Sequence, residues 1–261
     1  MAYLCLCNSK TVALLRYFLE LSYHGGAYHG WQRQPKEISV QEKLEQALEQ
    51  LLGVPIEVLG AGRTDAGVHA RQLYAHFDVA VDLPVKLDYM LNSILPLDIA
   101  VKEIFEVPEQ AHARFDALAR TYEYHIVHVK DPFVVDTAYF LKRPVDIEQM
   151  NMAAKILLEY SDFKCFSRSR TDVKTYNCEI EYAFWEQRED KLVFEIKANR
   201  FLRNMVRAIV GTLLEVGRGK LTVGDMHQII ASRDRSRAGA SVPAHGLFLT
   251  GIEYPETILK K

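Results

Sequence analysis

Cysteine is scarce in this sequence, and the cysteines that occur do not form the pairs that would bind zinc or build a disulfide framework. They stand without matched spacing at Cys5, Cys7, Cys165 and Cys178. No feature of the chain indicates secretion, so disulfides are not expected. This pattern predicts a protein of the reducing cytoplasm.

Long apolar runs are missing as well. No segment approaches the roughly 18 consecutive apolar residues of a membrane-spanning helix. The segment 1–15 is mildly apolar, but Asn8, Ser9 and Lys10 interrupt it, and it lacks the basic start and cleavage site of a signal peptide. We therefore expect no membrane partner and predict that residues 1–12 are an N-terminal extension.

Neither sign of charge dominates. The formal net charge is -2 and 49% of the residues are hydrophobic, as in ordinary globular proteins. A nucleic-acid partner would therefore have to meet a local basic face. Two basic segments exist, one with Lys164, Arg168, Arg170 and Lys174 and the other with Arg233, Arg235 and Arg237. Together they suit a phosphate backbone, although either one alone is more often a solvated loop.

The chain of 261 residues is long for one hydrophobic core and comfortable for two. Apolar patterning predicts strands at 18–23, 73–81, 99–107, 120–129, 176–185, 191–198 and 247–254, and helices at 40–52, 87–94, 146–160 and 201–216. Capping boxes begin the first of these helices at Ser39 and a further helix at Thr222. We expect an α+β fold of two similar domains, 13–110 and 111–261. Each is predicted to be an antiparallel sheet with helices on one face, and the two meet at a central catalytic cleft.

Glycine and charge concentrate in one segment, residues 60–70, which reads Gly-Ala-Gly-Arg-Thr-Asp-Ala-Gly-Val-His-Ala. Glycine permits positive φ and a close approach of backbone to ligand. Apolar segments on both sides predict strands, so Asp65 lies on a turn that a rigid frame can position. Considered by itself, the segment fits equally well a structural turn that is capped by its Asp.

Familiar ligand-binding loops do not explain this segment. A dinucleotide fingerprint needs a third glycine where Asp65 stands, and a phosphate loop needs Lys-Ser or Lys-Thr where Val68 and His69 stand. No second copy of the segment offers a partner carboxylate like that of an aspartic protease. Asp65 and His69 lack further ligands nearby in sequence. We therefore expect no metal site here.

Three arginines, Arg200, Arg203 and Arg207, are spaced to share one side of the helix predicted at 201–216. A solvated cationic stripe is the commoner meaning of such spacing. However, this helix is too apolar for the surface, and a buried arginine needs an anion. Arg207 lies deepest in the apolar stretch, so we expect it to pair with Asp65 if the two halves face each other.

Aromatic rings alternate along the strand predicted at 120–129, where Tyr122 and Tyr124 share one face with Arg120 beside them. Such rings are most often part of a core. An aromatic ring next to arginine also suits an unpaired base, and such stacking contributes about 1–3 kcal/mol per base.

These segments match a family. Over residues 18–254 the chain resembles the tRNA pseudouridine synthases of the A type. The family motif Gly-Arg-Thr-Asp-x-Gly-Val-His-Ala stands at 62–70, and further matches stand at 28–32, 91–96, 112–117, 120–124, 201–207 and 238–247. The sequence departs from the usual pattern at His24 and Gly26, where Asp and Thr are common, and at Cys178, where Arg is common.

The resemblance implies an isomerase that converts uridine to pseudouridine at positions 38, 39 and 40 of the tRNA anticodon stem-loop, as a homodimer and without cofactor or metal. It implies Asp65 as the nucleophile, Tyr122 as the ring that stacks on the base, and Arg207 as the partner of Asp65. The residues that we expect to bind substrate are Tyr122, Arg63, Arg120, Arg203, Gln32 and His69.

Two other functions fit part of the pattern. A non-catalytic RNA-binding module also combines aromatic strands with basic loops. A nucleoside or glycoside hydrolase also places an Asp near a ribosyl carbon, but that class usually carries a second carboxylate, which the loop does not offer.

Overall fold

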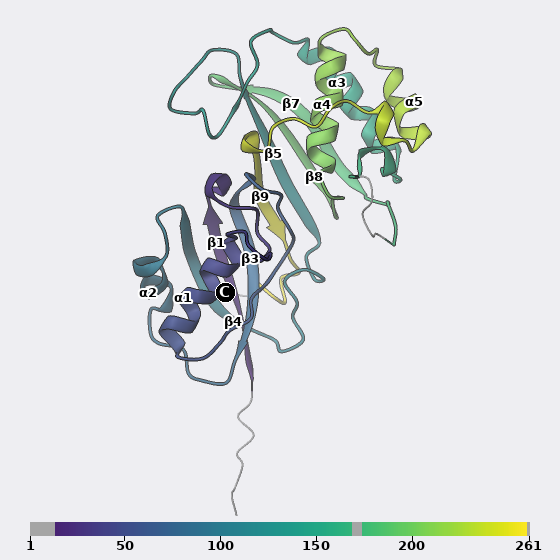
Figure 1. Cartoon of the computed structure of the whole chain (residues 1–261). Coiled ribbons are helices and arrows are strands. Elements are labelled where there is room, and N and C mark those ends of the chain that lie inside the picture. Colours follow the sequence, from purple (N-terminus) through teal and green to yellow (C-terminus); the bar gives the residue numbers. More distant parts are fainter. Residues whose placement is uncertain (1–13, 169–173, 260–261) are drawn as a thin grey trace, which may run out of the picture.

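The computed structural model describes residues 14–168 and 174–259, and its nine described strands form one sheet (Figure 1). The strands are β1 (Leu15–Tyr23), β2 (Leu59–Gly60), β3 (His69–Val79), β4 (Ile99–Val107), β5 (Ala119–Val127), β6 (Tyr139–Phe140), β7 (Ile180–Arg188), β8 (Lys191–Ala198) and β9 (Leu247–Glu253). Their order is β4-β1-β3-β9-β5-β8-β7, with β2 on β3 and β6 on β5. All pairs are antiparallel except β3 with β9 and β5 with β6. The fold is therefore mixed, with a large and mostly antiparallel sheet.

The strands of the two halves are joined, whereas the sequence led us to expect a separate sheet in each half. The cause is β9, which is last in the sequence but lies between β3 and β5. Its Leu249 is opposite Ala70 of β3 on one side and Tyr122 of β5 on the other. A single sheet consequently runs through both halves of the molecule.

The helices of the N-terminal half are α1 (Val40–Leu52) and α2 (Leu87–Ile94), as predicted. The Oγ of Ser39 accepts a hydrogen bond from the Glu42 amide, which confirms the predicted N-cap. Gly53 ends α1 in the left-handed conformation, with φ 71°. The buried residues of α1 are Val40, Leu44, Ala47 and Leu48, which lie on one face of the helix.

The helices of the C-terminal half are α3 (Ile147–Ile156), α4 (Met205–Gly217) and α5 (Asp225–Ser232). The start predicted for α4 was wrong by about one turn, because Asn204 adopts the left-handed conformation with φ 65° just before it. Arg200 and Arg203 therefore lie in the preceding segment and do not share a helical face with Arg207. The predicted capping box at Thr222 is present, since Thr222 and Asp225 exchange hydrogen bonds.

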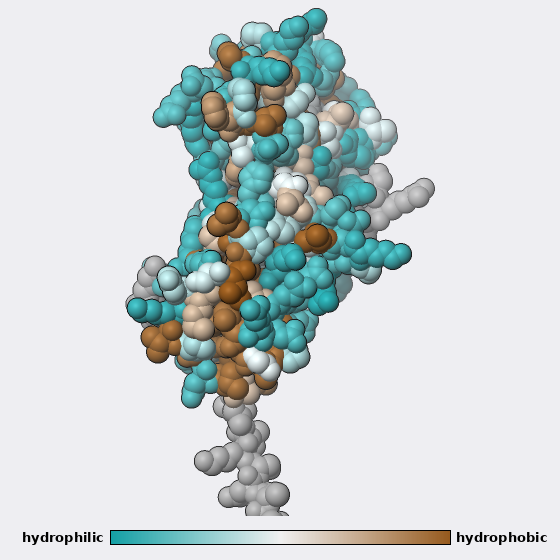
Figure 2. All heavy atoms as spheres, turned by 60° about the vertical axis from the view of Figure 1, so that its left-hand side comes forward, coloured by the Kyte–Doolittle hydropathy of each residue, from teal (hydrophilic) through white to brown (hydrophobic). Residues whose placement is uncertain are grey.

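Two apolar clusters flank the middle of the sheet. One gathers α1 and α2 with β1, β3 and β4, and the other gathers α3, α4 and α5 with β5, β7 and β8. Figure 1 shows these two sets of helices at opposite ends of the molecule, with β9 running back toward the N-terminal half. Each cluster also contains residues from the other half of the chain. Leu249, Ile252 and Tyr254 pack in the cluster of α1 and α2, and Val68 packs in the cluster of α3, α4 and α5. In the face that Figure 2 shows, hydrophobic residues collect on the N-terminal half.

Helix α4 approaches the chain at 239–242 closely enough to require glycine. A Cβ on Gly211 would lie 1.8 Å from the carbonyl oxygen of Ala240, and one on Gly239 would lie 2.8 Å from the backbone of Gly211. Both atoms that would clash belong to backbone, which cannot move aside as a flexible side chain can.

We predict that Gly211→Ala lowers the free energy of unfolding by about 1–3 kcal/mol, because overpacking forces the backbone apart. In an unhindered helix the same change would stabilise by about 1 kcal/mol. Gly224→Ala, whose Cβ would meet nothing closer than 3.8 Å, is the matched control. Urea unfolding measures both. An unchanged or raised stability of Gly211→Ala would contradict the close approach.

Candidate active site

The glycine-rich segment links β2 to β3 and presents Asp65 at the middle of the sheet. Its carboxylate is 24% exposed, so it is reachable but not freely solvated. The amide of Val68 donates to the carbonyl of Asp65 at 3.1 Å, which closes the turn. The predicted setting of Asp65, a turn between two strands, is therefore what the structure contains.

The segment 23–31 packs against this turn and is hydrogen-bonded to it. The hydroxyls of Tyr23 and Thr64 are hydrogen-bonded at 2.8 Å, and the amide of Gly67 donates to the carbonyl of Tyr28 at 3.2 Å. Gly30 has φ 88°, and a Cβ there would lie 2.2 Å from the carbonyl oxygen of Thr64. Only glycine allows this contact, so the Tyr-His-Gly-Trp-Gln segment at 28–32 serves to position the turn.

His69, the first residue of β3, fixes the C-terminal end of the turn. Its Nδ1 accepts from the Gly25 amide at 3.0 Å, and its Nε2 donates to the His245 carbonyl at 3.0 Å, which requires the neutral ring. The side chain is buried, and this desolvation, with His24 nearby, lowers the pKa of His69 to about 4. Both ring nitrogens are engaged by backbone, so the predicted RNA contact of His69 stays a prediction.

Two guanidinium groups face Asp65. Nη1 of Arg207, in the first turn of α4, lies 3.7 Å from Oδ2, and Nε of Arg203 lies 3.6 Å from Oδ1. The Nε of Arg207 donates to the Val242 carbonyl at 2.7 Å, which fixes its direction. The expected meeting of Arg207 and Asp65 thus occurs, and Arg203 joins it from the segment before the helix. Neither distance is that of a direct hydrogen bond, so the carboxylate oxygens stay accessible to a reacting atom.

Tyr122 approaches from the other side of β9. Its half-buried ring meets that of Phe201 edge-on, with centroids 5.2 Å apart and planes at 87°. Burial raises the pKa of Tyr122 to about 12, with Arg120 opposing and Asp65 adding to the shift. The hydroxyl therefore stays protonated at neutral pH, and the ring lies within electrostatic range of Asp65.

The guanidinium of Arg120 is hydrogen-bonded to backbone carbonyls of the protein. Its two terminal nitrogens donate to four carbonyl oxygens, those of Ala61, Arg114, Ala117 and Asn199. The guanidinium thereby ties the start of the Asp65 turn to the start of β5. All four terminal N–H groups are engaged, and a substrate contact of Arg120 stays a prediction.

Other predicted contacts lie nearer to solvent. Arg63 is exposed on the turn, and Gln32 is half-buried at the end of the segment 28–32. In the first of the two predicted basic segments, Arg170 lies outside the described residues. In the second, Arg233 forms an ion pair with Asp162. Arg235 donates to the carbonyls of Ala238 and Gly239 and to Ser241, so it holds the 238–241 chain that packs on α4.

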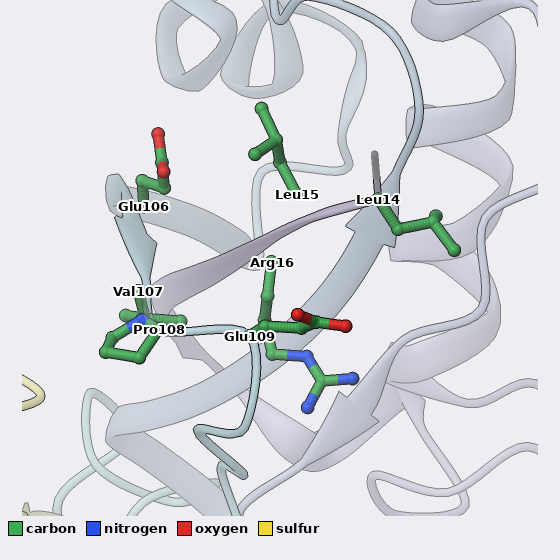
Figure 3. Close-up of a pocket in the computed structure, with 7 residues that line it drawn as sticks. All are labelled: Leu14, Leu15, Arg16, Glu106, Val107, Pro108 and Glu109. Atoms are coloured by element: carbon green, nitrogen blue, oxygen red, sulfur yellow. The ribbon is translucent and has the colours of Figure 1, made fainter. Parts of the chain in front are cut away.

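A surface hollow elsewhere contains none of these residues. It is lined by residues 14–16 and 106–109, at the start of β1 and the end of β4 (Figure 3). Arg16, its main cation, already donates two hydrogen bonds to Asp78 at 2.7 Å. We therefore assign it no function.

The described part of the chain holds no group of three or more His, Cys, Asp or Glu side chains placed to bind a metal ion. Within the same residues, no helix has the length and apolar character needed to cross a membrane.

Sequence comparison finds relatives that span nearly the whole chain. A protein named tRNA pseudouridine synthase A from Parabacteroides distasonis is 52% identical over 245 residues, which cover 93% of this chain and 97% of the relative. Proteins of the same name from Bacteroides fragilis and Porphyromonas gingivalis are 52% and 48% identical, over 95% and 94% of this chain and 100% and 99% of their own lengths. The family described as tRNA pseudouridine synthase matches residues 153–255. A solved structure of an unknown protein from Galdieria sulphuraria aligns with a TM-score of 0.23 at 9% identity, over 80% of this chain and 94% of that chain, and carries no argument.

We predict that acid destabilises the protein through His69. Its folded pKa of about 4 lies below the value near 6.5 of an unfolded histidine, so only the unfolded state takes up the proton as pH falls between them. Stability from this group is complete above pH ~6.5, and about 3 kcal/mol is lost by pH ~4. Denaturant unfolding at a series of pH values measures the slope.

In His69→Gln the loss of stability between pH 6.5 and 4.5 should be less steep than in the wild type, although the variant starts from a lower stability. His29→Gln, at a histidine whose side chain is 54% exposed, is the control and should keep the wild-type slope. Equal slopes for wild type and His69→Gln would rule out this role of the buried ring.

Proposed function

The chain belongs to the tRNA pseudouridine synthase A family, and on that premise we propose that it isomerises uridines at positions 38, 39 and 40 of the tRNA anticodon stem-loop with Asp65 as nucleophile. The family is one of isomerases that act on tRNA. The observation that carries the role of Asp65 is its reachable carboxylate, held on a braced turn with guanidinium groups 3.6 Å and 3.7 Å away.

The reaction rearranges the atoms of one nucleotide. The N1–C1′ bond of uridine breaks and a C5–C1′ bond forms, while C5 loses a proton and N1 gains one. The substrate and product have the same composition, so no oxidant, reductant or group donor takes part. One ionised carboxylate at the reacting nucleotide and a means of moving the proton are what the protein must supply.

The cations around Asp65 suit this task. A carboxylate that loses water tends to protonate, and a positive charge nearby opposes that tendency. Arg207 is fixed by Val242 and only 21% exposed, so its charge is weakly screened and acts on Asp65 at short range. Attack on C1′, attack on C6 and removal of a proton to form a glycal each require this ionised carboxylate.

The uracil has to leave its stack to reach Asp65, which costs a few kcal/mol and less at the end of a stem or in a loop. We assign Tyr122 as the ring on which the flipped base stacks. Arg63, exposed on the same turn as Asp65, then fills the vacated space or binds a flanking phosphate. Gln32, His69, Arg120 and Arg203 complete the proposed substrate contacts.

We also propose that the molecule is organised as two domains and acts as a dimer. Residues 13–110 and 111–261 act as two domains that face each other across the Asp65 turn, and the two apolar clusters support this division. The active form is a homodimer with tRNA spanning both subunits, and the hydrophobic residues gathered on the N-terminal half in Figure 2 suit a protein contact. The enzyme works in the cytoplasm and needs no cofactor.

Asp65→Asn tests the catalytic assignment. The amide keeps the shape of the side chain but removes the charge, so we expect tRNA binding to persist while pseudouridine formation falls at least ~1,000-fold. Asp82→Asn, at an exposed aspartate outside the site, should keep wild-type activity. Mapping of pseudouridine in a tRNA transcript measures the product. Product at the wild-type rate in Asp65→Asn would refute the assignment, and release of free uracil would indicate a hydrolase.

The two arginines beside Asp65 are expected to differ. Arg207→Gln should lower kcat by about 100- to 1,000-fold with little change in KM, because a fixed, half-buried charge stabilises the charged site. Arg203 is 57% exposed, so Arg203→Gln should chiefly raise KM for tRNA. Steady-state kinetics on one tRNA substrate separates the effects, and thermal unfolding controls for misfolding. A wild-type kcat in Arg207→Gln would contradict the proposed pairing.

A further inference from the structure

An aromatic ring projects into solvent close to the Asp65 turn. Phe115 is 75% exposed and lies in the segment 112–117, between β4 and β5. The ring of His112 lies against it with centroids 4.3 Å apart, and the guanidinium carbon of Arg114 lies 5.7 Å from its centroid. A single exposed apolar residue needs no explanation, so the meaning of this ring depends on how it is held and what surrounds it.

The segment that carries Phe115 is attached to the active-site turn through Arg120. One terminal nitrogen of Arg120 donates both to the carbonyl of Arg114 and to that of Ala61, where the Asp65 turn begins. The other donates to the carbonyl of Ala117, just after Phe115. A single half-buried guanidinium therefore fixes the distance between the exposed ring and the turn.

Further contacts make the segment rigid. The amide of Ala113 donates to Nδ1 of His76, and the hydroxyl of Tyr254 donates to the carbonyl of Ala113. The amide of His112 donates to the carboxylate of Asp116 at 2.7 Å, which closes the segment on itself. The ring of Phe115 is thus presented by a fixed frame, and little conformational entropy is lost when a flat partner stacks on it.

Positive charge gathers around this frame. Chiefly burial, and also the charges of Arg114 and Arg200, lower the pKa of Arg120. Among the described residues, no carboxylate lies within 4.0 Å of the guanidinium of Arg114 or Arg200. Guanidinium groups that form no ion pair within the protein are suited to an anionic ligand.

We propose that Arg114 and Phe115 form a second RNA contact, in which the Phe115 ring stacks on an unpaired base outside the reacting nucleotide and Arg114 binds a neighbouring phosphate. The inference rests on the proposed function, since it takes the substrate to be the anticodon stem-loop. Unpaired bases of RNA loops stack on aromatic and guanidinium planes, and the phosphate supplies the missing anion. The link through Arg120 sets this contact at a fixed separation from Asp65, so it helps to select which uridine reaches the carboxylate.

Binding of an unmodified anticodon stem-loop RNA tests the contact. In an Asp65→Asn background, where almost no product forms, Phe115→Ala should raise Kd roughly 5- to 150-fold, which corresponds to one lost base stack. Phe115→Trp should restore the affinity. Arg114→Gln should make the dependence of log Kd on log salt less steep by about one phosphate contact. Phe133→Ala, at another exposed phenylalanine, is the matched control and should bind as the parent does.

A second measurement separates RNA from a protein partner. Sedimentation of the Phe115→Ala variant should give the parent mass. Unchanged RNA affinity overturns the inference, and a changed mass with unchanged affinity shows that the ring packs against a second copy instead. If the wild-type chain forms no pseudouridine but Phe115→Ala still weakens RNA binding, the proposed function fails and the contact stands.

Discussion

A short parallel pairing joins His69 and Ala70 of β3 to Phe248 and Leu249 of β9. On its other side β9 pairs with β5, so the last strand of the chain connects strands from both halves. The ring of Phe248 stacks between those of His69 and His125, with centroids 4.6 Å apart in each case. The Asp65 turn ends at His69, so this junction sets the turn between the two apolar clusters and beside Tyr122 and α4.

The Asp65 turn gains its rigidity from close contacts with the backbone of the segment before α1. Gly25 and Gly30 allow the chain before α1 to press against Val68 and Thr64, where any Cβ would clash with a carbonyl oxygen. Because the turn is already in place, little reorganisation is needed when a substrate arrives, and the charge of Asp65 can act on it at once. The two arginines stand slightly too far away to hydrogen-bond with the carboxylate, which leaves its oxygens available.

Local sequence patterns suffice for the helices of the N-terminal half. Both helices of the N-terminal half agree with their apolar periodicity, and the Ser39 cap is where its side chain can accept the Glu42 amide. The start of α4 was misjudged, because nothing in the local pattern indicates that Asn204 turns left-handed. Arg203 therefore reaches Asp65 from a different direction than a shared helical face would give. The internal hydrogen bonds of Arg120 and His69 were also not foreseen, since their partners lie far away in sequence.

By itself the sequence determined most of the helices and strands, the glycine-framed turn with Asp65, and the resemblance that names the chemistry. These follow from features that act over a few residues: apolar periodicity, capping side chains, and glycines where the backbone must turn. Only the tertiary structure decided that the halves share one sheet through β9, that two guanidinium groups face Asp65, and that Phe115 is presented beside the turn. Such features depend on strand pairing and side-chain contacts between distant segments, and no local pattern specifies which segments will meet.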